Sequence, residues 1–73
     1  MDTYEYYLRD LAFILREQAQ EAKAKAVTSG DPYDKGRAFA YYEVTSLIAQ
    51  QAEAFQIPLE RLSWKDFDPE SLI

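Results

Sequence analysis

"AVTSGDPYD", residues 26–34, decides how this chain folds, because it interrupts one helical pattern and starts another. Residues 28–30 are typical of a helix C-terminus followed by a tight turn, and Asp31 followed by Pro32 is typical of an N-cap and a first helical position. Since the connection is only about four residues long, the flanking helices are expected to fold back as antiparallel neighbours. The sequence therefore predicts a helical hairpin.

Apolar side chains recur at steps of three and four on both sides of this turn, as expected for amphipathic helices. The first helix is expected over residues 3–27, and its apolar face comprises Tyr4, Tyr7, Leu8, Leu11, Ile14, Leu15, Ala19, Ala22 and Ala26. The second is expected over residues 32–55, with an apolar face of Ala40, Tyr41, Val44, Leu47, Ile48, Gln51, Ala52 and Phe55. Arg16 and Thr45 are expected to point outward.

Residues 58–73 form a C-terminal tail, which Pro58 separates from the second helix. We expect a short helical turn at residues 59–62 and a second helix start at Ser63 with Asp66. The apolar residues of the tail are Leu59, Leu62, Trp64, Phe67, Leu72 and Ile73. We expect them to cover an end or flank of the helical core; the alternative is a segment that docks on a partner. The predicted fold is all-α, with residues 1–73 as one domain made of the hairpin 1–57 and the tail 58–73.

The composition limits both stability and chemistry. The chain has 73 residues and contains neither cysteine nor histidine, so disulfides, zinc knuckles, thiol nucleophiles and the usual neutral-pH base are excluded. A domain of this size is only marginally stable without such staples, and oligomerisation is the remaining ordinary route. We therefore expect two hairpins to bury their apolar faces against each other in a homodimeric four-helix bundle.

Charge and hydropathy exclude two classes of partner. A net charge of −5 opposes binding to nucleic acid, which requires several Lys and Arg side chains at phosphates. The apolar runs are far shorter than the roughly 20 residues that cross a bilayer. The first ten residues, "MDTYEYYLRD", are acidic and aromatic, unlike an export signal. We expect an acidic cytoplasmic protein that binds neither nucleic acid nor membrane.

The stretch "DPYDKGRAFAYYE", residues 31–43, has the acids and the glycine of a calcium loop but not its ligands. With glycine at the sixth place, the third, fifth and twelfth places hold Tyr33, Lys35 and Tyr42, where oxygen ligands are required. The acids are better explained by the free N–H groups and the dipole of a helix N-terminus. Since recognisable catalytic motifs are also missing, we expect no catalytic residue, metal or cofactor.

Gly36 and Arg37 require another explanation. Gly36 and Ala40 form a small-residue surface, for which we expect close packing against a neighbour; the alternative is the approach of a ligand. Arg37 precedes Tyr41 by one turn, so it can stack on that ring or reach an acid such as Glu43. As a functional alternative, Arg37 could form a recognition patch with Tyr41 and Tyr42, since arginine and tyrosine are frequent in binding hot spots. The candidate packing and interaction residues are Gly36, Arg37, Ala40, Tyr41, Tyr42, Val44, Leu47, Ile48, Phe55, Trp64 and Phe67.

The run "GRAFAYYEVTSLIAQQAEAFQIPLE", residues 36–60, resembles the second-helix signature of small bacterial helical proteins of unknown function. This resemblance covers about a third of the chain and implies a bacterial, cytosolic protein without catalytic residues to carry over. In architecture the chain is also similar to the Rop-like hairpins, which pair into four-helix bundles. Rop binds RNA through a basic face, and this chain shows no matching run of Lys and Arg, so the likeness implies architecture and not function.

The sequence leaves three functional hypotheses. The preferred one is a non-enzymatic interaction or regulatory module that acts as a homodimeric bundle. The second is a monomer whose tail forms a third short helix and leaves a groove for a different protein, as in adaptor, antitoxin or immunity proteins. The third is a small-ligand or metal site built from Arg37, Tyr41, Tyr42 and nearby carboxylates.

Overall fold

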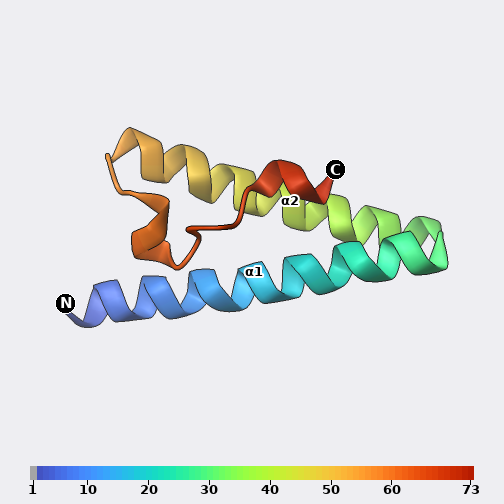
Figure 1. The fold of residues 1–73 in the computed structure, drawn as a ribbon, viewed down its shortest axis with the longest axis horizontal. Coiled ribbons are helices and arrows are strands. Elements are labelled where there is room, and N and C mark those ends of the chain that lie inside the picture. Colours follow the sequence, from blue (N-terminus) through green and yellow to red (C-terminus); the bar gives the residue numbers. More distant parts are fainter. Residues whose placement is uncertain (1) are drawn as a thin grey trace.

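The computed structural model describes residues 2–73, which form a long helical hairpin and a tail that contains two short 3-10 helices (Figure 1). The elements are α1 (Thr3–Ser29), α2 (Pro32–Ala54), η1 (Leu59–Leu62) and η2 (Pro69–Leu72). Both long helices end within two residues of the predicted limits. The predicted all-α hairpin is confirmed.

The turn between α1 and α2 is built as its sequence indicates. Gly30 ends α1 in the left-handed region, with φ 65°, a conformation that glycine adopts without steric cost. The Asp31 side chain caps α2 by accepting a hydrogen bond from the Tyr33 N–H at 2.8 Å. Ser29 Oγ donates to Asp34 Oδ2 at 2.7 Å and ties the two helix ends together. Both aspartates of the calcium-like stretch therefore act at the start of α2.

The other end of α2 stops without a glycine. Gln56 adopts the left-handed conformation, with φ 57°, and the Ile57 N–H donates to the Ala52 carbonyl at 2.8 Å. This bond is typical of a Schellman motif, which satisfies a carbonyl that the helix leaves free. The chain can then turn back along the hairpin.

The predicted helix start at Ser63 is wrong. Ser63 instead ends η1 in the left-handed conformation, with φ 63°. The next helical turn begins at Pro69, and Asp68 caps it by accepting from the Glu70 N–H at 3.0 Å. Proline at the first helical position favours this later start, because it has no N–H group to leave unsatisfied.

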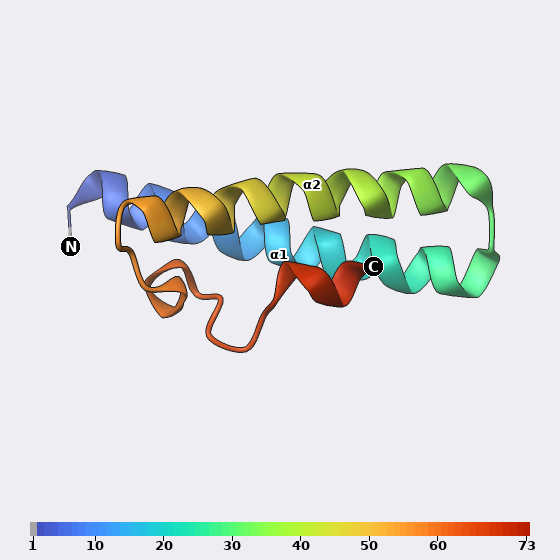
Figure 2. The same cartoon turned by 90° about the horizontal axis from the view of Figure 1, so that it is seen from above.

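The tail lies along one face of the hairpin (Figure 2). It first crosses to α1, which η1 contacts, and then returns to α2, which η2 contacts. Trp64, Phe67 and Leu72 expose only 1%, 4% and 3% of their surface. The expectation that the tail covers a flank of the helical core is confirmed.

Small residues form the seam between the helices and the tail. They recur every seven residues, as Ala12, Ala19 and Ala26 on α1 and as Ala38, Thr45 and Ala52 on α2, and all six are buried. A seven-residue spacing keeps side chains on one side of a helix over several turns. The seam therefore lets the two helices and the tail rings pack closely.

The outward placement predicted for Thr45 is wrong, because this residue is fully buried. Its hydroxyl donates to the Tyr41 carbonyl at 2.8 Å, one turn earlier in the same helix. A buried hydroxyl that keeps a hydrogen bond avoids most of the cost of leaving water. Thr45 can therefore take a core position that its polarity argues against.

Candidate interaction surface

Large apolar side chains remain exposed on the face of the hairpin that lies away from the tail. Because successive residues are turned by about 100° around a helix, Leu11 faces a different side from Ala12, which packs under the tail. We define the open face as Tyr7, Leu8, Leu11 and Ile14 of α1 with Val44, Leu47 and Ile48 of α2 and its C-cap residue Phe55. Ile48 is half-buried, and the other seven expose between 40% and 72% of their surface.

The structure thus divides the apolar stripe predicted for α1 into two parts. Its alanines, Ala19, Ala22 and Ala26, are buried, whereas Leu8, Leu11 and Ile14 are half exposed. The division follows from size, because the alanines leave room for the neighbouring helix and tail rings, and the longer side chains lie beside that seam. Among the described residues of this stripe, the large side chains remain in contact with water. These are the side chains that would bury the most apolar area in an interface.

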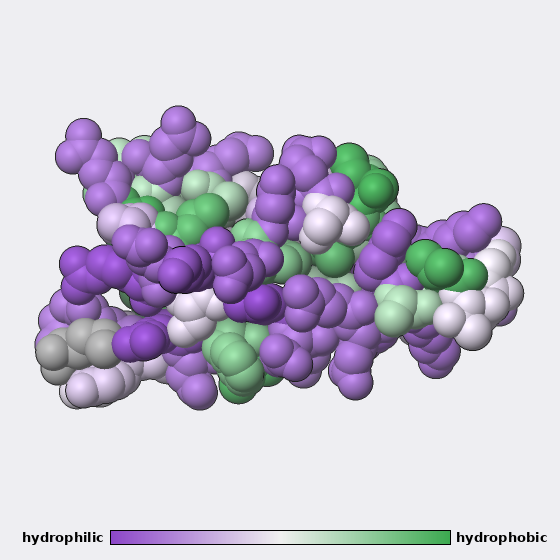
Figure 3. Space-filling view, viewed as in Figure 1, coloured by the Kyte–Doolittle hydropathy of each residue, from purple (hydrophilic) through white to green (hydrophobic). Residues whose placement is uncertain are grey.

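The face that carries the tail is more mixed, because Tyr6, Phe13, Phe39 and Ile73 expose 47% to 62% of their surface there. Polar side chains predominate on it in Figure 3. Arg16, which was expected to point outward, contacts the tail instead. Its Nη1 donates to the Ser63 carbonyl at 2.8 Å, and its guanidinium lies 5.8 Å from the centre of the Phe67 ring. Arg16 is therefore half-buried and fastens the tail to α1.

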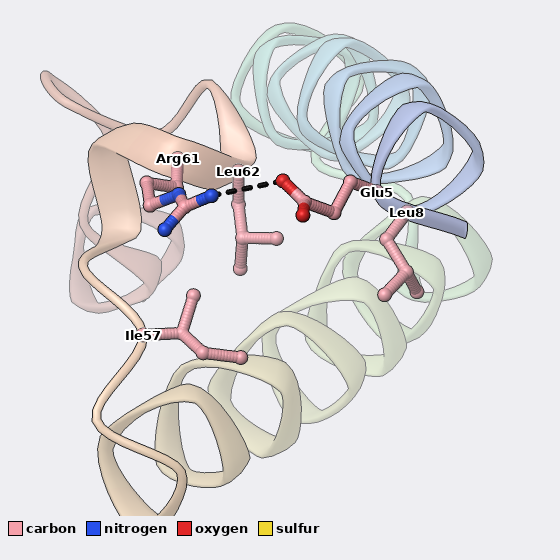
Figure 4. A pocket seen from close by; sticks show the side chains of 5 residues that line it. All are labelled: Glu5, Leu8, Ile57, Arg61 and Leu62. Atoms are coloured by element: carbon pink, nitrogen blue, oxygen red, sulfur yellow. Dashed lines mark hydrogen bonds and ion pairs between the residues drawn. The ribbon is translucent and has the colours of Figure 1, made fainter. Parts of the chain in front are cut away.

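A pocket of about 220 Å³ opens where the two helices diverge (Figure 4). Leu8 of α1, Leu62 of η1 and Ile57, which follows α2, provide its apolar walls. The ion pair between Arg61 Nη2 and Glu5 Oε2, at 2.8 Å, spans one side. We call the end of the hairpin where the start of α1 and the end of α2 diverge the splayed end. Because Leu8 also belongs to the open face, the pocket continues that face towards the splayed end.

The proposed recognition residues do not gather into one patch. The Arg37 guanidinium stacks over Tyr41, 5.4 Å from the ring centre. The Tyr41 hydroxyl donates to Gln18 Oε1 of α1 at 3.0 Å, whereas the Tyr42 hydroxyl donates to Glu70 Oε1 of the tail at 3.4 Å. The side chains of the two neighbouring tyrosines therefore lie on different faces of the hairpin.

The remaining predicted residues fall into the core or onto the surface. Trp64 and Phe67 form an edge-to-face pair in the core, with ring centres 5.2 Å apart. Gly36 and Ala40 are exposed. Among the described residues, no atom comes within 4 Å of the position that a Cβ of Gly36 would occupy. The close packing predicted for Gly36 is therefore not found within this chain.

Sequence reasoning did not select Leu8, Leu11 and Ile14 as interaction residues, although they form the α1 half of the open face. It also left Ala12 out of the apolar face of the first helix, and the structure buries this residue at 4% exposure. A usable signal was present, since small residues recur every seven positions in both helices. That repeat marks the seam and leaves the large apolar residues for another surface.

Within residues 2–73, no three acidic, histidine or cysteine side chains are placed so that they could hold a metal ion, and no helix is long and apolar enough to cross a membrane. No protein-family model matches the chain, and neither does a curated protein or a solved structure. The fold and surface define a small helical hairpin with its own tail packed on one face and large apolar residues exposed on the other.

Proposed function

We propose that this chain is a non-enzymatic, cytoplasmic protein-interaction module that acts as a homodimer, with the open face as its interface. One observation carries the proposal: seven large apolar residues of the open face expose 40% to 72% of their surface, while the tail packs on the other face. Contiguous exposed apolar surface of this kind marks interaction sites in soluble proteins.

The dimensions of the open face suit a protein partner. The molecule measures 41 by 20 Å along its two longest axes, so one face offers at most about 800 Å² per partner, which is the size of a standard specific interface. A small ligand would cover only a fraction of it. The pocket at the splayed end would then receive one side chain of the partner.

The chemistry of the open face favours a second copy. On α1, every position on this side from Tyr4 to Gln18, at steps of three and four, is uncharged, although Asp, Glu, Lys and Arg make up 29% of the chain. A face built for a basic partner would carry acids, because charge complementarity steers such complexes. An uncharged apolar face is complementary to itself, and isologous pairing of two copies is the commonest route to a closed assembly.

Charged substitutions on opposite sides of α1 test the proposal. Leu11 is 40% exposed on the open face, and Phe13 is 47% exposed on the same helix, turned by about 200°. We expect Leu11→Glu to yield a monomer with an unchanged circular dichroism spectrum, and Phe13→Glu to remain a dimer. Light scattering during size-exclusion chromatography reads the mass of each variant.

Two results of this experiment would contradict the proposal. If Leu11→Glu stays dimeric, another surface holds the dimer together. If the unmodified chain is a monomer at every concentration, the open face serves a heterologous partner, as an adaptor or immunity protein would use it. Since both substituted residues are exposed, folding should survive in both variants, and the comparison reports on association.

A further inference from the structure

Resting on the proposed homodimer, we infer that the two copies pack antiparallel about a two-fold axis that passes between Leu11 and its symmetry mate and between Ile48 and its symmetry mate. The α1 helices then face each other, as do the α2 helices. The hairpins overlap at their splayed halves and form a four-helix bundle there, with their turns pointing to opposite ends.

The open face of α1 is symmetric about Leu11. Leu8 and Ile14 lie three residues on either side of it, Tyr7 and Leu15 lie four residues away, and Tyr4 and Gln18 lie seven residues away. All of these positions are uncharged. When two copies of a helix pack antiparallel about a two-fold axis, a residue that lies before the axis in one copy meets the residue that lies equally far after it in the other copy. Leu8 of one copy would therefore meet Ile14 of the other.

On α2 the inferred axis passes Ile48, which like Tyr41 is half-buried and packs partly against the core. Tyr41 and Phe55 lie seven residues before and after it, so each Tyr41 ring would meet the Phe55 ring of the other copy. Phe55 exposes 72% of its surface in the single chain. Aromatic pairs of this kind contribute more than their buried area alone. The interface would thus contain two equivalent aromatic contacts, one on each side of the axis.

The two centres lie at the same level of the hairpin. The hydrogen bond between Tyr41 and Gln18 sets these residues side by side. Seven residues from Gln18 towards the N-terminus lead to Leu11, and seven from Tyr41 towards the C-terminus lead to Ile48. Both steps cover about 10 Å in the same direction, because the helices are antiparallel. A single axis can therefore pass through both positions.

This register makes use of the pocket at the splayed end. Leu8 forms one of its walls, together with Ile57 and Leu62 (Figure 4). With Leu11 on the axis, the Ile14 side chain of the other copy comes to the rim of this pocket. Each hairpin then contributes one isoleucine and receives one, which gives the exposed pocket an occupant from the dimer itself.

The register also sets the strength of the association. Leu11 lies five residues before Arg16, the middle of α1, so the two hairpins are displaced by about 15 Å. They then overlap over about 26 Å of the 41 Å length and bury about 500 Å² per copy. A total near 1,000 Å² is the lower limit for a specific interface. We expect a dimer that dissociates measurably on dilution.

Single cysteines test the register cleanly, because the chain has none of its own. Leu11→Cys should form a disulfide-linked dimer in high yield on mild oxidation, since a disulfide requires Cα atoms within about 7 Å. Phe13→Cys, on the far side of α1, should give little linked dimer. Ile48→Cys should link to itself, and a mixture of Leu11→Cys with Ile48→Cys should give the two homodimers rather than the mixed species.

Each outcome bears on a different claim. If the mixed species predominates, α1 faces α2 of the other copy with the turns at the same end, and the register is overturned. If the unmodified chain is a dimer by mass but Leu11→Cys does not link to itself, the register again fails while the proposed function stands. If the unmodified chain is a monomer at every concentration, both fail.

Non-covalent association provides a second readout. Phe55→Ala should weaken dimerisation at least about fivefold, because it removes both aromatic contacts. Phe39→Ala is the matched control, since Phe39 exposes 51% of its surface and lies about 160° around α2 from Phe55. Equal effects of the two substitutions would contradict the inferred register.

Discussion

The indole N–H of Trp64 donates a hydrogen bond to the Ala12 carbonyl at 2.9 Å, and this bond joins two buried residues that lie 52 positions apart in the chain. It places the largest side chain of the tail on the small-residue seam of α1. The tail is thereby fixed on one face of the hairpin, and the opposite face keeps its large apolar residues exposed.

Removing this contact should destabilise the fold. We expect Trp64→Phe to lower the free energy of unfolding by about 2 kcal/mol, because it removes one buried hydrogen bond and leaves a small cavity. Trp64→Ala should cost about 3 to 5 kcal/mol. Urea titrations followed by circular dichroism measure both values, with Tyr33→Phe, 76% exposed, as the control. A Trp64→Phe variant as stable as the original would show that the tail is not fastened through this ring.

Thr45 offers a test of the seam. Its hydroxyl bonds to a carbonyl of its own helix, so Thr45→Val keeps the shape and gives up a weak contact. We expect a change within about 1 kcal/mol, of either sign. Thr45→Ser keeps the hydroxyl but removes a methyl group from a fully buried site, and should cost about 1 kcal/mol. If valine proved much more destabilising than serine in thermal unfolding, the hydroxyl and not the methyl group would hold the seam.

The two glycines should respond in opposite directions to the same substitution. Gly36→Ala should stabilise the protein by up to about 1 kcal/mol, because Gly36 is helical and, within the described chain, an added Cβ meets nothing within 4 Å. Gly30→Ala should destabilise it by about 1 kcal/mol, since Gly30 has φ 65° and side chains are strained there. Melting temperatures of the two variants suffice. A loss of stability in Gly36→Ala would point to a neighbour that covers Gly36 in an assembly.

The hairpin could be predicted from sequence because its signals are local. Gly30, Asp31 and Pro32 each suit a single place in a helix-turn-helix connection, and the structure places each of them there. Ser63 was misread because its side chain suits an N-cap, but the chain uses it in the left-handed conformation that ends η1. Local sequence alone does not distinguish these two uses.

The interaction surface was only partly predictable, because it depends on contacts between distant segments. Val44, Leu47 and Phe55 were selected from the periodicity of α2, and all three are exposed on the open face. Which half of the α1 stripe is covered depends on where Trp64 and Phe67 dock. The covered half is the one whose alanines leave room for these large rings. Helical periodicity alone contains no information about this fit.

The most direct test of the open face as a homodimer interface is the solution mass of the unmodified chain, measured by sedimentation equilibrium over a wide concentration range in about 0.15 M salt, where repulsion between acidic copies is screened within about 8 Å. We expect the mass to rise with concentration from 8.5 kDa to twice that value. A mass of 8.5 kDa at every concentration would contradict the proposed homodimer.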